Sequence, residues 1–492
     1  MIGARNIVFA LVAIIAAGCV TVGPDYRKPE LPLPEAWSRT GSSDNSATLS
    51  FRAEELSRWW ECMGDPVLTG LIEQAIKEGT DLRAARARLM EARARAGLAG
   101  AQLFPSLTGS ASGSRSKSSR EVGSGNTRTF YSIGFDASWE LDVFGGIRRG
   151  IEAAHADLEG AEAVLYATQV SLAAEVALNY VTARSYMERL YIARKNLESQ
   201  SETLQLTDWR NQAGLASSLV VDQARTNLEQ TRSRIPALSI GLAEAENRLA
   251  VLLGRAPGAV REILSTEALV PEVPDSIAIG IPVQALGNRP DVRIAERKLA
   301  AETARVGQAI AARYPGFSVN AYIGLEALTL GGLDSGNAIA RSVMGRMFGT
   351  IFDAGRLRRQ VEIRDAIQEQ ALIAYEASVL AALEDVENAL VSLSENRNQQ
   401  AALQSAAEAA HNAALLARHL YTGGMIDFQT VLDTERTQFT VEENLAIAKA
   451  NGASALIRLY KALGGGWSPA EASVVEDATN GDGNGKIDGG GT

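Results

Sequence analysis

The chain has 492 residues and a formal net charge of −10, from 48 Lys and Arg against 58 Asp and Glu. It is 46% hydrophobic but only 6% aromatic, and its mean hydropathy is −0.04. This many apolar residues exclude disorder over most of the length, and an acidic chain without a basic stripe argues against nucleic-acid binding. The two cysteines exclude a disulfide scaffold and a multi-cysteine metal site.

The N-terminus has the pattern of a bacterial secretory signal peptide over residues 1–18. Its apolar run, residues 7–17, is too short for a membrane span, which needs about 20 residues. The run ends in the lipobox-like motif AAGC, so we expect cleavage before Cys19 and lipidation of its thiol. An ordinary signal peptide followed by a coincidental cysteine is the alternative. Val20 at the next position is typical of sorting to the outer membrane.

Both ends of the mature chain lack the pattern of folded structure. Residues 19–60 contain four closely spaced prolines, which oppose helix, and we expect a lipid anchor and an extended tether there. Residues 469–492 are expected to form a flexible Gly-rich tail. Its segment 480–488 resembles the first half of a calcium-binding EF-hand loop but lacks the acidic twelfth ligand. With Cys19 lipidated, an intramolecular disulfide is excluded, because Cys62 is the only other cysteine.

Between these ends the sequence repeats itself. Three aspartates of the first half recur with similar neighbours 210 or 211 residues later: Asp81 as Asp291, Asp142 as Asp353, and Asp222 as Asp433. A nearly constant separation at three places predicts a duplication. We therefore predict two structural repeats, residues 61–256 and 291–468, joined by a linker or equatorial segment at 257–290.

Each repeat is predicted to contain a β-hairpin, at about residues 105–143 and 315–352, with the last strand near 343–352. Apolar and polar residues alternate over 131–143, the period of a strand with one apolar face. The polar face, expected to meet water, carries Asp136, Glu140 and Asp142. Such strands can cross a bilayer, although strands of a soluble sandwich alternate in the same way. Since four strands cannot close a barrel and open edges are not tolerated in lipid, membrane insertion would require several chains to share one barrel.

Two very long helices form the other half of the predicted fold. No proline occurs at 145–212 or 355–422, and each stretch of about 68 residues would measure roughly 100 Å as a helix. Apolar residues step by three and four within both stretches, which is typical of a coiled-coil-like seam. Both stretches end near glycines, Gly214 in the first copy and Gly423-Gly424 in the second, which allow a turn into a returning helix.

Several motifs carry a resemblance to a known family: GPDY at 23–26, WELDVFG at 139–145, IFDAGRL at 351–357, YTGG at 421–424, VLDTER at 431–436 and LYKALGGGW at 459–467. Over about residues 19–468 the chain resembles the TolC-like outer-membrane factor family, in its lipoprotein branch of NodT/OprM-like exit ducts of RND-type multidrug efflux pumps. The resemblance implies a mainly α protein with membrane β, in which each protomer has long α-hairpins and four strands. It also implies a homotrimer with a shared β-barrel in the outer membrane and a periplasmic α-barrel, and as partners a periplasmic adaptor and an inner-membrane transporter.

The resemblance further implies a gate at the periplasmic tip, beyond the helix-break turn. Asp433 matches a gate aspartate, and Arg436 on the same helical face could neutralise it or reach a neighbour. Weaker gate candidates are Asp427, Gln429 and Thr430, the repeat-one equivalents of the gate pair are Asp222 and Arg225, and the turn residues are Tyr421, Gly423, Gly424 and Gly214. For both pairs the alternative is a solvated ion pair contributing under about 1 kcal/mol. Ile426 replaces an arginine of some relatives, so we expect a less tightly latched gate.

The sequence lacks the patterns of enzymes and cofactor sites. It contains no Gly-rich phosphate loop followed by Lys, no nucleophile–His–Asp order and no zinc-ligand spacing. We therefore predict no catalytic residues, no metal and no cofactor. The family resemblance implies an exit duct that passively conducts drugs or other small molecules. The alternatives are the same duct serving type I protein secretion or metal-cation efflux, or a lipid-anchored coiled-coil adhesin or scaffold.

Overall fold

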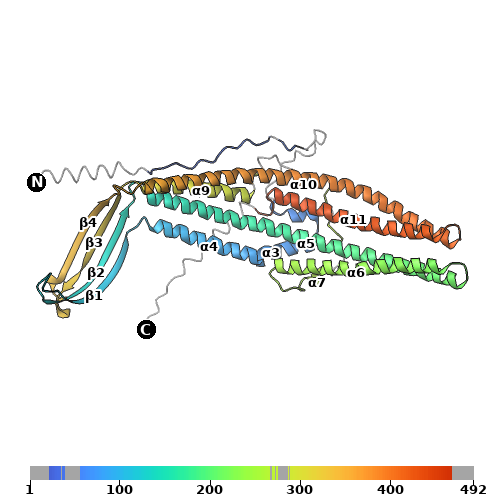
Figure 1. Cartoon of the computed structure of the whole chain (residues 1–492), viewed down its shortest axis with the longest axis horizontal. Coiled ribbons are helices and arrows are strands. Elements are labelled where there is room, and N and C mark those ends of the chain that lie inside the picture. The colour runs from blue at the N-terminus through green and yellow to red at the C-terminus, as the bar shows by residue number, and fades with distance from the viewer. Residues whose placement is uncertain are drawn as a thin grey trace. The chain divides into compact units, whose positions relative to one another are not determined.

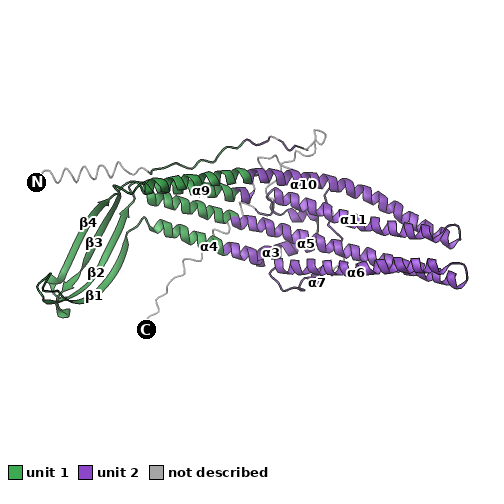
Figure 2. Ribbon diagram, viewed as in Figure 1, with its two compact units in different colours: residues 1–31, 87–163, 293–377 green, residues 32–86, 164–292, 378–492 purple. Residues whose placement is uncertain are grey.

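The computed structural model of the chain describes residues 21–34, 36–38, 56–265, 269–271, 273–274, 286–287 and 289–467. The predicted lipidation site Cys19 and the predicted tail at 469–492 lie outside these residues. The chain divides into two compact units, coloured separately in Figure 2. Unit 1 comprises Met1–Leu31, Ala87–Ala163 and Arg293–Ala377, and unit 2 comprises Pro32–Arg86, Val164–Val292 and Ser378–Thr492.

Unit 1 contains a four-stranded antiparallel sheet in which strand order follows chain order (Figure 1). Its strands are β1 (Ser106–Lys117), β2 (Thr127–Leu141), β3 (Gly316–Ala327) and β4 (Ile339–Phe348). Each repeat supplies one hairpin, and β2 joins β3 with Phe135 opposite Ile323. Within the described chain, β1 and β4 are edge strands. The last strand was expected near 343–352, but it starts and ends about four residues earlier, and residues 349–355 connect it to the next helix, which begins at Arg356.

Large apolar side chains of the sheet are exposed in this single chain. Ile133, Phe135 and Ile323 are between 52% and 58% exposed, and Val343 is 80% exposed. Successive side chains of a strand point to opposite faces, so the alternation in the sequence places these residues in rows along the strands. An exposed apolar surface of this kind indicates contact with lipid or with another chain.

Helices make up most of the rest of both units. The long helices are α5 (Gly146–Gln212) and α10 (Arg356–Thr422), and their returning partners are α6 (Ser218–Leu252) and α11 (Phe428–Ala462). The shorter helices are η1 (Trp59–Met63), α3 (Pro66–Glu78), α4 (Thr80–Ala101), α7 (Arg261–Leu264), α9 (Pro290–Ala311), η2 (Leu330–Gly332) and η3 (Gly336–Ala338). None of the described helices carries an apolar stretch long enough to cross a membrane. The chain is thus mainly helical with a small antiparallel sheet, as the sequence predicted.

The repeated aspartates before the long helices are N-terminal caps. Asp142 accepts hydrogen bonds from the backbone N–H groups of Ile147 (3.0 Å) and Arg148 (2.9 Å), which have no carbonyl partner within the helix. Asp353 accepts from Gly355 (2.9 Å) and Leu357 (3.0 Å) in the same way. The assignment of Asp142 to the wet face of the strand was therefore wrong, because the strand ends at Leu141 and the carboxylate turns to the helix.

The N-terminal segment of unit 1 is held by a buried arginine. Arg149 is 3% exposed, and its guanidinium donates to the carbonyl oxygens of Val22 (3.1 Å) and Gly23 (3.2 Å) and to the carboxylate of Asp25 (2.8 Å). Tyr26 then donates its hydroxyl to Glu296 on α9 over 2.6 Å. The segment is thereby fixed to a helix of each repeat.

In unit 2, a chain of polar contacts leads from a helix cap into the core. Asp65 caps α3 by accepting from the N–H groups of Val67 (2.8 Å) and Leu68 (3.1 Å), and its other oxygen accepts from the hydroxyl of Tyr180 (2.5 Å). The same hydroxyl accepts from Arg184 Nε over 2.9 Å. Arg184 is only 1% exposed, so its guanidinium is solvated by protein groups, and its Nη1 also donates to the carbonyl oxygen of Leu264 over 3.1 Å.

Candidate gate at the helix turns of unit 2

The two long helices of unit 2 end in matching turns. Gly214 and Gly424 both have φ of 74°, a left-handed conformation that costs glycine little and other residues more. The N–H of Leu215 donates to the carbonyl of Arg210 (2.8 Å), and that of Met425 donates to Leu420 (2.9 Å). The structure thus has Gly214, Gly423 and Gly424 in the turns, whereas Tyr421, which was predicted with them, lies in the last turn of α10.

The two turns are packed together by apolar side chains from all four helices. The cluster consists of buried Ala224, Ala417, Tyr421, Phe428, Val431 and Leu432, with Leu204, Leu206, Val220 and Ile426 against it. Ile426 contributes apolar contact here. The two helical hairpins, α5–α6 and α10–α11, therefore meet near their turns.

The predicted gate residues at the start of α11 bond mainly to one another. Asp427 caps the helix by accepting from the backbone N–H (3.0 Å) and the hydroxyl (2.7 Å) of Thr430. These two bonds hold the pKa of the Asp427 carboxyl below its usual range. Gln429 donates its side-chain amide to Asp433 over 3.0 Å, and Asp433 is exposed.

The two predicted arginine–aspartate pairs differ. Arg225 and Asp222 form an exposed ion pair at 4.0 Å. Arg436 instead reaches the neighbouring helix α6, where its Nε donates to the side-chain oxygen of buried Asn227 over 3.0 Å. Arg436 therefore forms a link between the two hairpins.

The sequence patterns did not reveal Glu435, a buried carboxylate beside the gate candidates. Its side chain on α11 is 2% exposed, accepts from the hydroxyl of Thr203 on α5 (2.9 Å), and lies 3.2 Å from Arg418 Nε on α10. Its second oxygen is buried with no hydrogen-bond partner among the described residues. The helical period could have identified it, because position 435 falls four residues after buried Val431, and the equivalent in the first repeat is buried Ala224.

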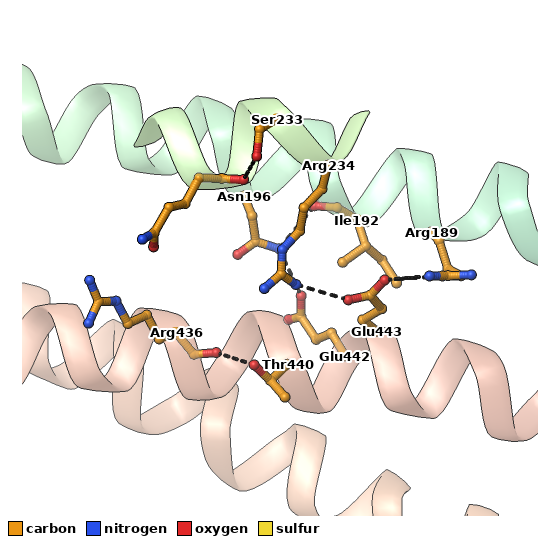
Figure 3. Close-up of polar contacts among 10 residues, drawn as sticks. Arg189, Ile192, Asn196, Ser233, Arg234, Arg436, Thr440, Glu442 and Glu443 are labelled. Carbon is orange, nitrogen blue, oxygen red and sulfur yellow. Dashed lines mark hydrogen bonds and ion pairs between the residues drawn. The ribbon is translucent and has the colours of Figure 1, made fainter. Parts of the chain in front are cut away.

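Further polar contacts between the hairpins lie along α11 (Figure 3). Glu443 accepts from Arg189 on α5 (2.7 Å) and from Arg234 on α6 (3.2 Å). Glu442 accepts from Asn196 on α5 over 3.2 Å. Nearer the turns, Arg210 donates to the carbonyl of Tyr421 (2.8 Å), and its guanidinium lies 4.6 Å from the centre of that ring. We call these contacts the hairpin seam: Arg210–Tyr421, Thr203–Glu435, Asn227–Arg436, Asn196–Glu442 and Arg189/Arg234–Glu443.

We expect protonation of Glu435 to stabilise the folded chain, so that this residue contributes more to the unfolding free energy in acid than at neutral pH. Burial raises the pKa of the Glu435 carboxyl, although Thr203 and Arg418 oppose this shift. A raised pKa in the folded state means that this group favours folding fully below its unfolded pKa, about 4.3, and that the contribution is lost as pH rises through the folded pKa. Glu435→Gln resembles the protonated form, so its unfolding free energy should exceed that of the wild type at neutral pH, with the difference narrowing toward about pH 4.

Chemical denaturation at several pH values measures this difference. The matched control is Glu229→Gln, which changes an exposed carboxylate paired with Arg232 on the same helix. The difference in unfolding free energy between Glu229→Gln and the wild type should vary little with pH. If it varied as strongly as that of Glu435→Gln, the raised pKa of Glu435 would be contradicted.

The seam offers contacts between helices and no reactive constellation. Within the described residues, no three His, Cys, Asp or Glu side chains are grouped so that they could hold a metal ion. What the arrangement can do is connect or release two helical hairpins, because each contact joins one hairpin to the other.

Comparison with known proteins identifies the family. A family model described as outer membrane efflux protein matches residues 71–255 and 281–465, once in each repeat. Nodulation protein T of Rhizobium leguminosarum bv. trifolii is 31% identical over 465 residues, which cover 93% of this chain and 96% of that protein. Cation efflux system protein CusC of Escherichia coli O6:H1 is 30% identical over 460 residues, which cover 93% and 97%.

The fold is also that of a solved channel. The structure of the outer-membrane channel OprN matches with a TM-score of 0.85 and 36% sequence identity, covering 91% of this chain and all of that one. The resemblance seen in the sequence is thereby confirmed. The chain belongs to the outer membrane efflux protein family, and it is an outer-membrane channel protein and not an enzyme.

Proposed function

We propose that the chain is the exit duct of a tripartite efflux system and conducts small molecules passively to the exterior. The observation that carries the proposal is the hairpin seam, because a duct that opens and closes at one end needs helices joined by contacts that can be broken. Its partners would be a periplasmic adaptor and an inner-membrane RND-type transporter. Cys19, as the lipidated N-terminus after removal of residues 1–18, would add a lipid anchor.

The sheet supports an assembly of several chains. Its two edge strands leave backbone N–H and C=O groups that lipid cannot satisfy. Further copies would supply partners for both edges, and the family resemblance implies three copies sharing one barrel. The repeats at 61–256 and 291–468 would then each line the duct, with 257–290 between them.

Asp433 is the proposed gate carboxylate. In a trimer, its exposed position would bring three like charges around one axis, where they would repel one another or bind cations. Arg436 does not relieve this charge in the present structure, since its Nε bonds to Asn227.

We expect Asp433→Ala to change single-channel conductance in planar bilayers, raising it or raising antibiotic leak in cells. Asp208→Ala is the matched control, since Asp208 on α5 is exposed, accepts a hydrogen bond from a glutamine side chain as Asp433 does, and is not a gate candidate. Unchanged conductance would remove Asp433 from the gate. The absence of any pore current from the wild type would reject the duct itself and favour a lipid-anchored adhesin or scaffold.

Metal-cation efflux is a second candidate, which the similarity to the cation efflux protein CusC favours. The same duct could also serve type I protein secretion. A deletion strain tested against antibiotics, solvents and metal ions separates these cargoes. Sensitivity confined to metal ions would assign the duct to a cation pump.

A further inference from the structure

The two long helices begin at equivalent positions with two arginines each, but these arginines differ in their partners and in their exposure. Arg148 and Arg149 at the start of α5 correspond to Arg358 and Arg359 at the start of α10, 210 residues later. In the first repeat both arginines have partners close by. Arg148 pairs with Asp142 at 3.1 Å, and Arg149 is buried by the N-terminal segment.

In the second repeat the corresponding arginines face outward. The side chains of Arg358 and Arg359 are each 78% exposed, and they share one carboxylate, Glu362, at 3.1 Å and 2.6 Å. Arg356 beside them is exposed as well. Asp353 accepts hydrogen bonds from two backbone N–H groups of the helix start, and its negative charge interacts with Arg356. Three guanidinium groups against the two carboxylates, Glu362 and Asp353, leave this cluster with a net charge of +1, since 3 − 2 = 1.

Apolar side chains directly precede these arginines along the chain. Ile351 is 101% exposed and Phe352 is 88% exposed, and both follow the exposed edge strand β4, whose last residue, Phe348, is 58% exposed. The order from the strand onward is thus apolar, aromatic, then basic. At a membrane boundary this order matches the passage from acyl chains to phosphate-bearing headgroups.

We propose that Arg356, Arg358 and Arg359 bind the phosphate groups of anionic phospholipids in the periplasmic leaflet, with Ile351 and Phe352 among the acyl chains. Guanidinium groups bind phosphate oxygens through two parallel hydrogen bonds, and a basic cluster beside a bilayer attracts anionic lipid. The inference rests on the proposed function in one respect, the insertion of the strands into the outer membrane. We call this cluster the arginine ledge.

The test uses the full chain in lipid bilayers of two compositions. Wild type in phosphatidylcholine vesicles with added phosphatidylglycerol should unfold at a higher temperature than in phosphatidylcholine alone, and native mass spectrometry should show retained phosphatidylglycerol. Arg358→Gln/Arg359→Gln should lose most of this preference. The control Arg88→Gln/Arg95→Gln removes two exposed arginines from α4 in the same unit and should keep the preference.

Each other outcome overturns the proposal in a distinct way. Equal phosphatidylglycerol preference in wild type and the ledge variant would show that these arginines do not bind lipid. Stabilisation by inorganic phosphate without anionic lipid would assign a free anion site instead. Weakened association between copies, with lipid preference unchanged, would assign the ledge to a protein interface. Pore current is recorded in parallel, so that a conducting chain without lipid preference rejects this inference and leaves the duct standing.

Discussion

Arg210→Ala is expected to raise the probability that the resting channel is open by about one to two orders of magnitude. Arg210 donates to the Tyr421 carbonyl and lies over the Tyr421 ring, so that α5 is joined to the turn end of α10. A charge-assisted hydrogen bond contributes about 1.5–3 kcal/mol, and a cation–π contact contributes about 0.5–1 kcal/mol. In the proposed gate, the closed state would contain the hairpin seam, and a loss of about 2–3 kcal/mol from that state would change the ratio of closed to open channels by roughly 30- to 150-fold.

Single-channel recording in planar bilayers measures this change. The matched control is Arg232→Ala, since Arg232 pairs with Glu229 on its own helix and makes no contact of the hairpin seam. Tyr421→Leu keeps the carbonyl and removes the ring, so it separates the two contributions. Equal open probability of the Arg210 and Arg232 variants would show that this contact does not hold the turn closed.

Asp65→Ala is expected to destabilise unit 2 by about 2–4 kcal/mol, because it removes a helix cap and also leaves the buried Tyr180 hydroxyl without its hydrogen-bond acceptor. The carboxylate accepts hydrogen bonds from Val67, Leu68 and Tyr180, and the Tyr180 hydroxyl in turn accepts one from Arg184 Nε. Tyr180→Phe removes one hydroxyl and keeps the cap, so it should cost less, about 1–2 kcal/mol.

Chemical or thermal unfolding of the variants measures these costs. Asp427→Ala is the control for capping alone, since Asp427 caps α11 from an exposed position without a buried partner. If Asp65→Ala and Asp427→Ala cost the same, Asp65 acts as a helix cap alone and its connection to Arg184 contributes nothing to stability.

The sequence predicted what depends on local periodicity. Proline-free stretches with apolar residues three and four apart became α5 and α10, and alternation over 131–143 became β2. Glycine at 214 and 424 marked the turns, because few other residues adopt a positive φ. Asp142 was misassigned for a related reason, since alternation continues past the last strand residue into a helix cap.

The polar links of the seam could not be predicted in this way. Glu435 and Thr203 are 232 residues apart, and Arg436 and Asn227 are 209 residues apart. A period reports which face of a helix is buried, but it does not report which distant side chain lies opposite. Arg210 carried no signal at all, because its partner is a backbone carbonyl that any residue could supply.

The N-terminal segment bound to Arg149 affects the symmetry of the proposed trimer. Duplication left the chain with two equivalent helix starts, but a chain has only one N-terminus, and the described part of the N-terminal segment covers the start of α5. The proposed trimer would have six related helix starts. Around the axis, starts covered by an N-terminal segment would alternate with starts that have exposed arginines. The backbone of the proposed trimer would then have nearly sixfold symmetry, but the exposed arginines at the membrane boundary would have only threefold symmetry. Three ligand sites would form there, where the fold alone would offer six.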